Sequence, residues 1–242
     1  GLTNANISAD LELATEYADN LALTTREIDQ TLRALNAEYI EPGPGNDPVR
    51  NPDALPTGRN FYGFDQRKFP DEETQAMGAS LADQLVEDYY SNNGAYPSKV
   101  SYVLWAMETL RHHGLMEAQV YSLLGVAPVR DQGRITGFKV LPLEEMNHPR
   151  VDVMIHSSGL YRDTFPYQLE LIDEAVRTVA ELNETNETNY VRCNSLKMED
   201  ALIANGYNES TAHYLSRSRI FSEAPGNYDN GMEDAIAASN TW

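Results

Sequence analysis

Four residues in the stretch 152–163 have side chains that could carry acid–base or metal chemistry. They are Asp152, His156, Arg162 and Asp163. The imidazole of His156 can ligate a divalent metal or take up a proton near neutral pH, and the carboxylate of Asp163 can act as a base. Structural roles are also open, because Asp152 can pair with Arg150 and because Asp163 or Thr164 can cap a following helix. We expect capping to be the larger part of the role of Asp163.

Glu108 and the run Arg111-His112-His113-Gly114 form a second candidate group. Adjacent histidines on a helix or turn face different directions, so the pair is not a bidentate metal site by itself, and such pairs are usually solvated helix ends. We therefore take His112 and His156 as separate candidate metal ligands. Glu108, His156 and Asp163 are the candidates for metal or proton handling.

The elements that must position these residues alternate between strands and helices. Strands are expected over 100–105, 127–130, 136–141 and 151–156, of which the first and last read as buried. Helices are expected over 71–90, from 107 or 115 to 124, and over 166–182, 195–205 and 210–216. This order predicts an α/β fold with an open, mostly parallel sheet and helices on both faces. Glu108, Arg130-Asp131 and the His156-Ser-Ser-Gly159 turn should then lie beyond the carboxyl ends of strands, where such sheets bind ligands.

Residues 1–38 read as a helical segment. An amphipathic helix is expected over 9–23, and Thr24 with Glu27 forms a capping box for a second helix that carries Ile28, Leu32 and Leu35 on one face. We expect both helices to pack against other parts of a longer parent chain. Residues 70–242 then form the α/β domain, with a helical C-terminal part.

Between these parts, residues 39–69 form a long segment rich in Pro, Gly, Asn and Asp, each of which favours turns. Disorder is one interpretation of such a segment. We favour an ordered, functional loop, because it contains the apolar anchors Leu55, Phe61, Tyr62 and Phe64 and displays Arg50, Arg59 and Asn60 between its turns.

The composition limits the possible partners and chemistries. A formal charge of −19 and a pI near 4.5 argue against binding to nucleic acid or to an anionic membrane surface. Cys193 is the only cysteine, which excludes a disulfide within the chain and a zinc site of several thiolates, and we expect it to be buried. The absence of a long apolar run predicts a cytoplasmic protein. Phosphate-binding G-x-x-x-x-G-K-S/T and nucleophile G-x-S-x-G motifs are absent.

Five blocks of sequence, in order, carry a resemblance to one family. They are residues 42–48 with 55–62, 103–106 with 111–114, 125–131, 149–152 with 158–163, and 219–228. Together they resemble the large subunit of the ATP-dependent tetrapyrrole metal chelatases, the family of the cobaltochelatase large subunit (CobN) and the magnesium chelatase H subunit. Chains of that family are several times longer, so this one resembles a fragment of the C-terminal half.

The resemblance implies an enzyme, a ligase that forms nitrogen–metal bonds, of which this fragment alone is expected to be inactive. The large subunit holds a cyclic tetrapyrrole and the divalent metal substrate, while an AAA+ ATPase subunit and a second chelatase subunit act as partners and use ATP. The metal replaces two pyrrole protons. For Co²⁺ the implied acceptor is hydrogenobyrinic acid a,c-diamide; for Mg²⁺ it is protoporphyrin IX.

Local details of the family pattern bear on the metal and the substrate. Arg111-His112-His113-Gly114 followed by Leu115 is closer to the cobalt branch, because the magnesium branch tends to have a residue other than histidine there and Gly-Glu. In the family, Gly-Arg commonly precedes Pro-Arg, whereas this chain has Met146-Asn147-His148 there. If that family arginine binds substrate carboxylates, His148 weakens the expectation of the same role at this position.

A tetrapyrrole rich in carboxylates needs cationic groups to hold it, and the candidates lie in the expected loops. The substrate-binding candidates are Arg50, Arg59, Asn60, Arg111, Arg150 and Arg162. A rival hypothesis is that the fragment is a non-catalytic docking module for the AAA+ partner. The two hypotheses differ in whether these arginines converge on one cavity.

Overall fold

The computed structural model describes residues 4–45, 48 and 52–229 and divides the chain into two compact units. The N-terminal unit is Gly1–Asp65 and the C-terminal unit is Gln66–Trp242. Among the described residues, no helix combines the length and the apolar character that crossing a bilayer requires.

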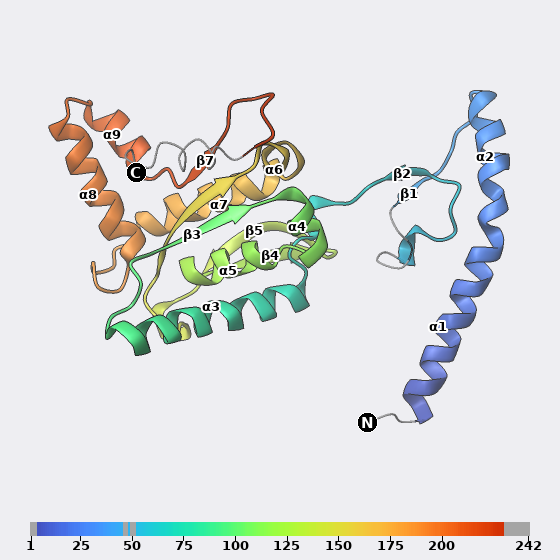
Figure 1. The fold of residues 1–242 in the computed structure, drawn as a ribbon, viewed down its shortest axis with the longest axis horizontal. Coiled ribbons are helices and arrows are strands. Elements are labelled where there is room, and N and C mark those ends of the chain that lie inside the picture. Colours follow the sequence, from blue (N-terminus) through green and yellow to red (C-terminus); the bar gives the residue numbers. More distant parts are fainter. Residues whose placement is uncertain (1–3, 46–47, 49–51, 230–242) are drawn as a thin grey trace. The chain divides into compact units, whose positions relative to one another are not determined.

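The N-terminal unit begins with two helices, α1 (Asn4–Ala22) and α2 (Arg26–Leu35), joined by a 3-10 turn over Leu23–Thr25 (Figure 1). Both helices were predicted, but the capping box at Thr24 is wrong. Thr24 lies inside the 3-10 turn, and the amide of Arg26 already donates to the carbonyl of Leu23. Helical backbone continues through the turn, since Thr25, the residue before α2, has helical dihedral angles and no side-chain cap hydrogen bond. The apolar side chains of α2 remain exposed, Leu35 to 79%.

The Pro- and Gly-rich segment contains a short parallel pair of strands, β1 (Pro42–Pro44) and β2 (Asn60–Tyr62), and a 3-10 turn over Pro52–Ala54. Leu55 is buried as expected of an anchor, whereas Phe61 and Tyr62 are 72% and 48% exposed. Those two residues therefore do not anchor the loop in this unit. Arg50 lies outside the described residues.

The C-terminal unit is built on a parallel sheet with the strand order β3 (Lys99–Leu104), β6 (Asp152–Ser157) and β7 (Ile220–Ser222). This confirms the predicted open parallel sheet. The prediction that β3 is buried on both faces is wrong, since Lys99 and Ser101 are exposed. An edge position explains this, while the central strand β6 is almost entirely buried. The short strand β7 was not predicted.

The strands β4 (Val126–Asp131) and β5 (Arg134–Val140) form a separate antiparallel hairpin. Gln132 and Gly133 connect them with φ values of 48° and 76°, the paired left-handed conformation of a tight hairpin turn. Arg130-Asp131 therefore lies at this turn and not at the carboxyl edge of the parallel sheet, which corrects that expectation.

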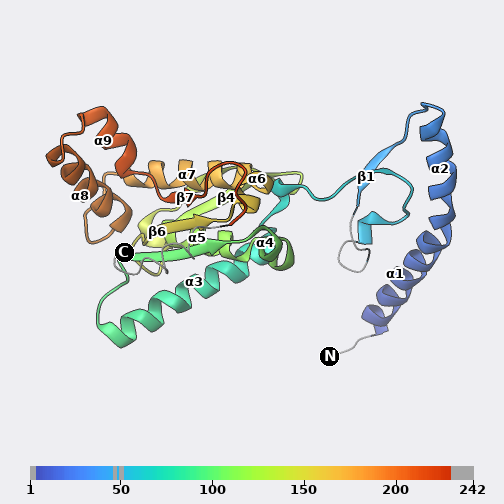
Figure 2. The same cartoon turned by 45° about the horizontal axis from the view of Figure 1, so that its top comes forward.

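Helices surround the strands. Figures 1 and 2 show α3 (Glu72–Asn93), α5 (Leu115–Leu124) and α7 (Pro166–Ala180) in that order across the unit. The helix α3 begins at Asp71, whose carboxylate accepts the Thr74 amide, and ends at Gly94. A side chain at Gly78 would lie 2.4 Å from Ala118, so α3 and α5 pack closely because both residues are small. The short helices α4 (Ala106–His112) and α6 (Gly159–Thr164) follow β3 and β6.

The helices α8 (Tyr190–Ala204) and α9 (Glu209–Ser216) complete the unit, and a 3-10 turn spans each of Gln66–Lys68 and Leu143–Glu145. α8 packs against β6 through Asn194, whose amide donates to Asp152 at 2.9 Å. Because strand side chains alternate, Val153 and Ile155 point to the opposite face of the sheet, and both are fully buried.

The carboxylate of Asp152 joins all three parallel strands. It is fully buried at the start of β6 and lies 2.7 Å from Nε of Arg219, which immediately precedes β7. Lys99 of β3 approaches the same carboxylate at 3.7 Å. Asp152 could also have paired with Arg150, but its partner is Arg219, because Arg150 pairs with Glu184.

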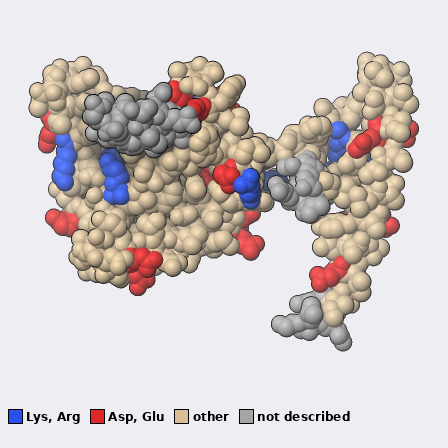
Figure 3. Space-filling model, in the orientation of Figure 1, with Lys and Arg blue, Asp and Glu red and all other residues tan. Residues whose placement is uncertain are grey.

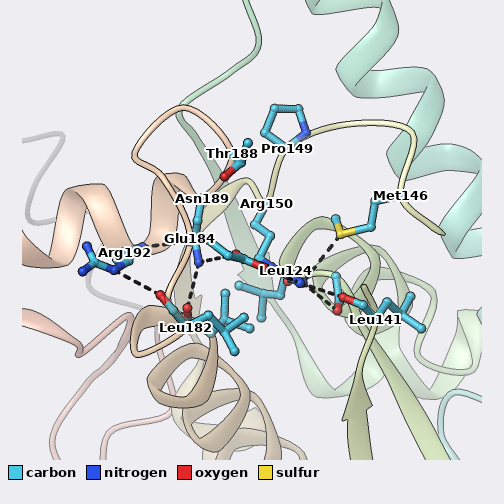
Figure 4. A network of polar contacts seen from close by, with 12 residues as sticks. Leu124, Leu141, Met146, Pro149, Arg150, Leu182, Glu184, Thr188, Asn189 and Arg192 are labelled. Carbon is cyan, nitrogen blue, oxygen red and sulfur yellow. Dashed lines mark hydrogen bonds and ion pairs between the residues drawn. The ribbon is translucent and has the colours of Figure 1, made fainter. Parts of the chain in front are cut away.

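Arg150 is 1% exposed and lies at the centre of the network drawn in Figure 4. Its Nε and Nη2 donate to Glu184 at 2.8 and 3.0 Å. Its guanidinium also donates to the carbonyl oxygens of Leu124, Gly125 and Leu141 at 3.1, 2.9 and 2.6 Å and to Sδ of Met146 at 3.6 Å. Gly125 is needed there, since a side chain would lie 2.3 Å from the guanidinium. This geometry gives Arg150 a structural role and argues against the predicted substrate contact.

Arg150→Met should lower the free energy of unfolding by about 3–5 kcal/mol, because it strands Glu184 and three carbonyl groups in the interior. Urea denaturation followed by circular dichroism measures this. The control is Arg177→Met, which removes a partly exposed pair with Asp173 and should cost below about 1 kcal/mol. Equal losses in the two variants would contradict the structural role of Arg150.

Candidate functional site

The carboxyl edge of the parallel sheet brings together most of the candidate residues in the C-terminal unit. β3 leads into α4, which carries Glu108, Arg111 and His112, and β6 ends at Ser157 after His156. α6 follows directly and carries Arg162 and Asp163. α4 and α6 contact one another. This is the edge at which parallel sheets bind ligands, so its residues define the first candidate site.

His156 is half-buried between the neighbouring strands, in register with Val103 on one side and Phe221 on the other. Its ring centroid is 6.0 Å from that of Phe221. Within the described part of the chain, the imidazole has no side-chain hydrogen bond or ion pair. The imidazole is therefore a candidate at this edge that no other described side chain engages through a hydrogen bond or an ion pair.

His112 is a poorer metal ligand than the sequence indicated. Its Nδ1 accepts the backbone amide of Leu115 at 3.0 Å, which makes it a cap for α5. The neutral ring must then carry its proton on Nε2, and that nitrogen is buried without a partner among the described residues. In a metal-bound histidine, the nitrogen that does not bind the metal usually carries a proton and donates a hydrogen bond. Nδ1 of His112 accepts a hydrogen bond instead, so this arrangement disfavours metal binding through Nε2. No cluster of three or more metal-ligating side chains is found in the described part of the chain.

Arg162 and Asp163 pair with each other on the surface of α6, with Nε–Oδ1 and Nη2–Oδ2 distances of 2.8 and 3.1 Å. The hydrogen bond from Arg162 lowers the pKa of Asp163, which makes this carboxylate a weaker base. The capping role predicted for Asp163 or Thr164 is wrong. Both residues lie in the last turn of α6, and Phe165 precedes α7 without a side-chain cap.

Two of the sequence blocks meet at the start of α6. The amide of Gly159 donates to the carbonyl of Asp229 at 2.9 Å, and a side chain at Gly159 would lie 1.8 Å from the carbonyl oxygen of Asn227. Arg162 donates from Nη1 to the carbonyl of Glu223 at 2.5 Å. The segment that follows β7 therefore crosses the carboxyl edge beside α6, and only glycine fits at position 159.

On α4, Glu108 and Arg111 form an exposed pair with a 2.6 Å Oε1–Nη1 distance. The helix ends at His112, because His113 and Gly114 adopt left-handed backbone with φ values of 54° and 83°. Glu108 and Arg111 thus remain accessible to a ligand, although they already form an ion pair with each other.

A second candidate site lies within the N-terminal unit. A cavity of about 960 Å³ lies between α2 and the Pro- and Gly-rich segment. Residues from both elements line it; these include Glu27, Glu38, Pro42, Pro44, Thr57, Arg59, Asn60 and Phe61.

Arg59 supplies the positive charge of this cavity. Its side chain passes over Gly43, where an added Cβ would lie 2.1 Å from Cδ of the arginine. Nη1 donates weakly to the carbonyl of Asp53 at 3.4 Å. Nε of Arg59 and the hydroxyl of Thr57 are buried and have no partner among the described residues. Two unpartnered donors beside apolar walls suit a carboxylate on a flat, apolar ligand.

Within the C-terminal unit the candidate arginines do not converge on one cavity, because Arg150 is buried and Arg111 and Arg162 lie at the carboxyl edge. Arg59 lines the cavity of the N-terminal unit. On the face shown in Figure 3, basic side chains form separate spots among acidic ones and not a continuous patch.

Two residues that shape the carboxyl edge, Arg219 and Gly159, were not predicted to do so from the sequence. Arg219 fixes β7 beside β6 through Asp152 and also donates to Ser195 at 3.0 Å. Gly159 lets the segment at Asn227 approach. Both lie in the blocks that carry the family resemblance, which was the signal available in the sequence. Their partners are distant in sequence, so only the fold shows what they contact.

Comparisons with known proteins agree with the sequence blocks. The family model described as CobN/Magnesium Chelatase matches residues 2–242. The chain is 38% identical to an uncharacterised protein of Methanocaldococcus jannaschii, over 98% of this chain and 19% of that protein. It is 37% identical to the chloroplastic magnesium-chelatase subunit ChlH of Oryza sativa subsp. japonica, over 89% of this chain and 15% of that protein.

A solved structure matches as well. The catalytic subunit of cobaltochelatase from Mycobacterium tuberculosis aligns with a TM-score of 0.67 and 38% identity, covering 95% of this chain and 19% of that one. The chain thus spans less than a fifth of the length of each of these relatives. Because the family model matches nearly every residue, the chain belongs to the CobN/magnesium chelatase family.

Proposed function

We propose that the chain is part of the large, tetrapyrrole-binding subunit of an ATP-dependent metal chelatase. The complete protein would insert Co²⁺ into hydrogenobyrinic acid a,c-diamide. The match of the family model over residues 2–242 carries this proposal. The sequence at Arg111-His112-His113-Gly114, followed by Leu115, supports the cobalt branch.

Insertion of Mg²⁺ into protoporphyrin IX is the second candidate. The identity to the rice magnesium-chelatase subunit, 37%, is almost the same as the 38% identity to the mycobacterial cobaltochelatase subunit. Overall similarity therefore does not discriminate between the two metals, and the preference for cobalt rests on the local pattern around His112.

Insertion exchanges the inner N–H protons of the macrocycle for one divalent metal ion. The site must therefore accept protons and replace the water bound to the metal. His156 suits the proton-accepting role best, because its ring lies at the carboxyl edge without a side-chain partner among the described residues. Asp163 suits it less, since Arg162 holds its carboxylate in a bidentate pair. Glu108 stays a further candidate at the same edge.

Binding of the macrocycle requires cations for its carboxylates and apolar walls for its flat face. Arg59, Thr57 and Asn60 with Pro42, Pro44 and Phe61 offer both in the cavity of the N-terminal unit. Within the C-terminal unit, Arg111 and Arg162 are the candidate cations at the carboxyl edge. The chain would act with an AAA+ ATPase subunit and a second chelatase subunit, which would hydrolyse ATP.

The complete subunit, supplied with its ATPase partners and ATP, should insert Co²⁺ into hydrogenobyrinic acid a,c-diamide, followed by the absorbance change of the corrinoid. Protoporphyrin IX with Mg²⁺ serves as the competing substrate. Insertion only into the porphyrin would overturn the cobalt assignment in favour of magnesium. If residues 1–242 in isolation bound the ATPase and neither macrocycle, the docking-module hypothesis would replace both for this chain.

Arg59→Gln should weaken tetrapyrrole binding by about tenfold to a hundredfold, because a hydrogen bond from a charged donor to a carboxylate is lost. Quenching of the intrinsic fluorescence during titration with the macrocycle measures the dissociation constant. Lys197→Gln, an exposed change of the same charge on α8, should leave the constant unchanged. Equal affinity of Arg59→Gln and the parent protein would remove Arg59 from the binding site.

His156→Gln should lower kcat for metal insertion by about a hundredfold while leaving the tetrapyrrole dissociation constant within about twofold, as expected for a lost proton acceptor. The control is His213→Gln on α9, whose imidazole lies 3.5 Å from both Glu181 and Glu199. Insertion at the parent rate by His156→Gln would exclude a catalytic role for this imidazole.

A further inference from the structure

A buried carboxylate connects the two helices that carry the candidate residues of the carboxyl edge. Glu117 lies in the first turn of α5 and is fully buried. Its Oε1 accepts hydrogen bonds from the hydroxyl of Thr109 at 2.9 Å and from that of Tyr161 at 2.7 Å. Thr109 belongs to α4 and Tyr161 to α6, so a single oxygen atom joins both helices.

The second oxygen of this carboxylate, Oε2, is buried and has no partner among the described residues. In that part of the chain, no cationic side chain forms an ion pair with Glu117. A buried carboxyl group without a cation is costly, and an apolar side chain of similar size would serve stability better. The presence of Glu117 in the otherwise apolar interior of α5 therefore calls for a role beyond stability.

Tyr161 is suited to remain the hydrogen-bond donor in this contact. Burial, together with the neighbouring Glu117, raises the pKa of Tyr161 well above its usual value, so its hydroxyl keeps the proton. Its ring also stacks on Phe165 with a centroid distance of 5.0 Å. Tyr161 is thus held at its hydroxyl by Glu117 and at its ring by Phe165.

The two linked helices depend on such contacts. α4 has 7 residues and α6 has 6, and helices this short do not hold their position in water without tertiary support. In each helix the residue bonded to Glu117 is the immediate neighbour of a candidate residue. Thr109 follows Glu108, and Tyr161 precedes Arg162. A shift at Oε1 would therefore move both candidates.

We propose that Glu117 is a positioning residue for metal insertion. Through Thr109 and Tyr161 it sets the distance and orientation between α4 and α6, and so between the Glu108–Arg111 and Arg162–Asp163 pairs. The inference deepens the proposed function and rests on it for the catalytic consequence. The mechanical link itself is independent of which metal or macrocycle is used.

The test uses the complete subunit with Glu117→Met, which keeps the size of the side chain and removes both acceptor oxygens. Hydrogen exchange measured by mass spectrometry should show amide exchange in α4 and α6 faster by about tenfold, with α3 and α8 unchanged. In the insertion assay, kcat should fall about tenfold to a hundredfold, with KM for the tetrapyrrole nearly constant.

Two further variants separate positioning from simple loss of stability. Glu117→Gln keeps an oxygen that can accept both hydroxyl bonds, so it should restore the exchange pattern and most of kcat. Gln168→Met is the matched control, because Gln168 is equally buried but its side chain bonds to Tyr121 and to the carbonyls of Gln66 and Phe69. It should leave exchange in α4 and α6 and the value of kcat unchanged.

Faster exchange spread evenly over the C-terminal unit in Glu117→Met, or the same loss of kcat in Gln168→Met, would overturn the proposal. So would a failure of Glu117→Gln to restore the exchange pattern. If the parent subunit inserted no metal, the proposed function would fail while the exchange data still decided whether Glu117 holds α4 and α6 together.

Discussion

The carboxylate of Asp152 is the interaction on which the carboxyl edge depends. It sits fully buried at the start of the central strand, pairs with Arg219 ahead of β7, accepts a hydrogen bond from Asn194 of α8 and attracts Lys99 of β3. β7 has only three residues and could not hold its place through backbone pairing alone. Fixing Arg219 therefore fixes β7, and the segment after β7 can then reach Gly159.

Features governed by local chemistry were predictable from the sequence. The start of α3 at Asp71, its end at Gly94 and the end of α5 at Gly125 follow from the capping preferences of those residue types. The parallel sheet followed from the alternation of strands and helices. The hairpin of β4 and β5 was not predicted, because the left-handed turn at Gln132-Gly133 decides between antiparallel pairing and entry into the sheet.

Features that depend on distant partners were not predictable. Arg150 resembled a loop cation, but Glu184 and three carbonyl groups from other segments enclose its guanidinium. Asp163 resembled a helix cap, yet Arg162 holds it in the last turn of α6. Glu117 was visible in the sequence only as an acidic residue in the apolar stretch of α5. Its role appears once the fold brings Thr109 and Tyr161 from two other helices to its carboxylate. In each case a charged group took its role from its neighbours in space.

We propose that a tetrapyrrole and a divalent metal bind to this part of the subunit. A structure of the complete subunit with the macrocycle and metal bound, determined by electron cryo-microscopy, tests it most directly. We expect the ring nitrogens of the macrocycle to face His156 at the carboxyl edge of the C-terminal unit. A macrocycle bound entirely to parts of the subunit outside residues 4–229 would contradict this account.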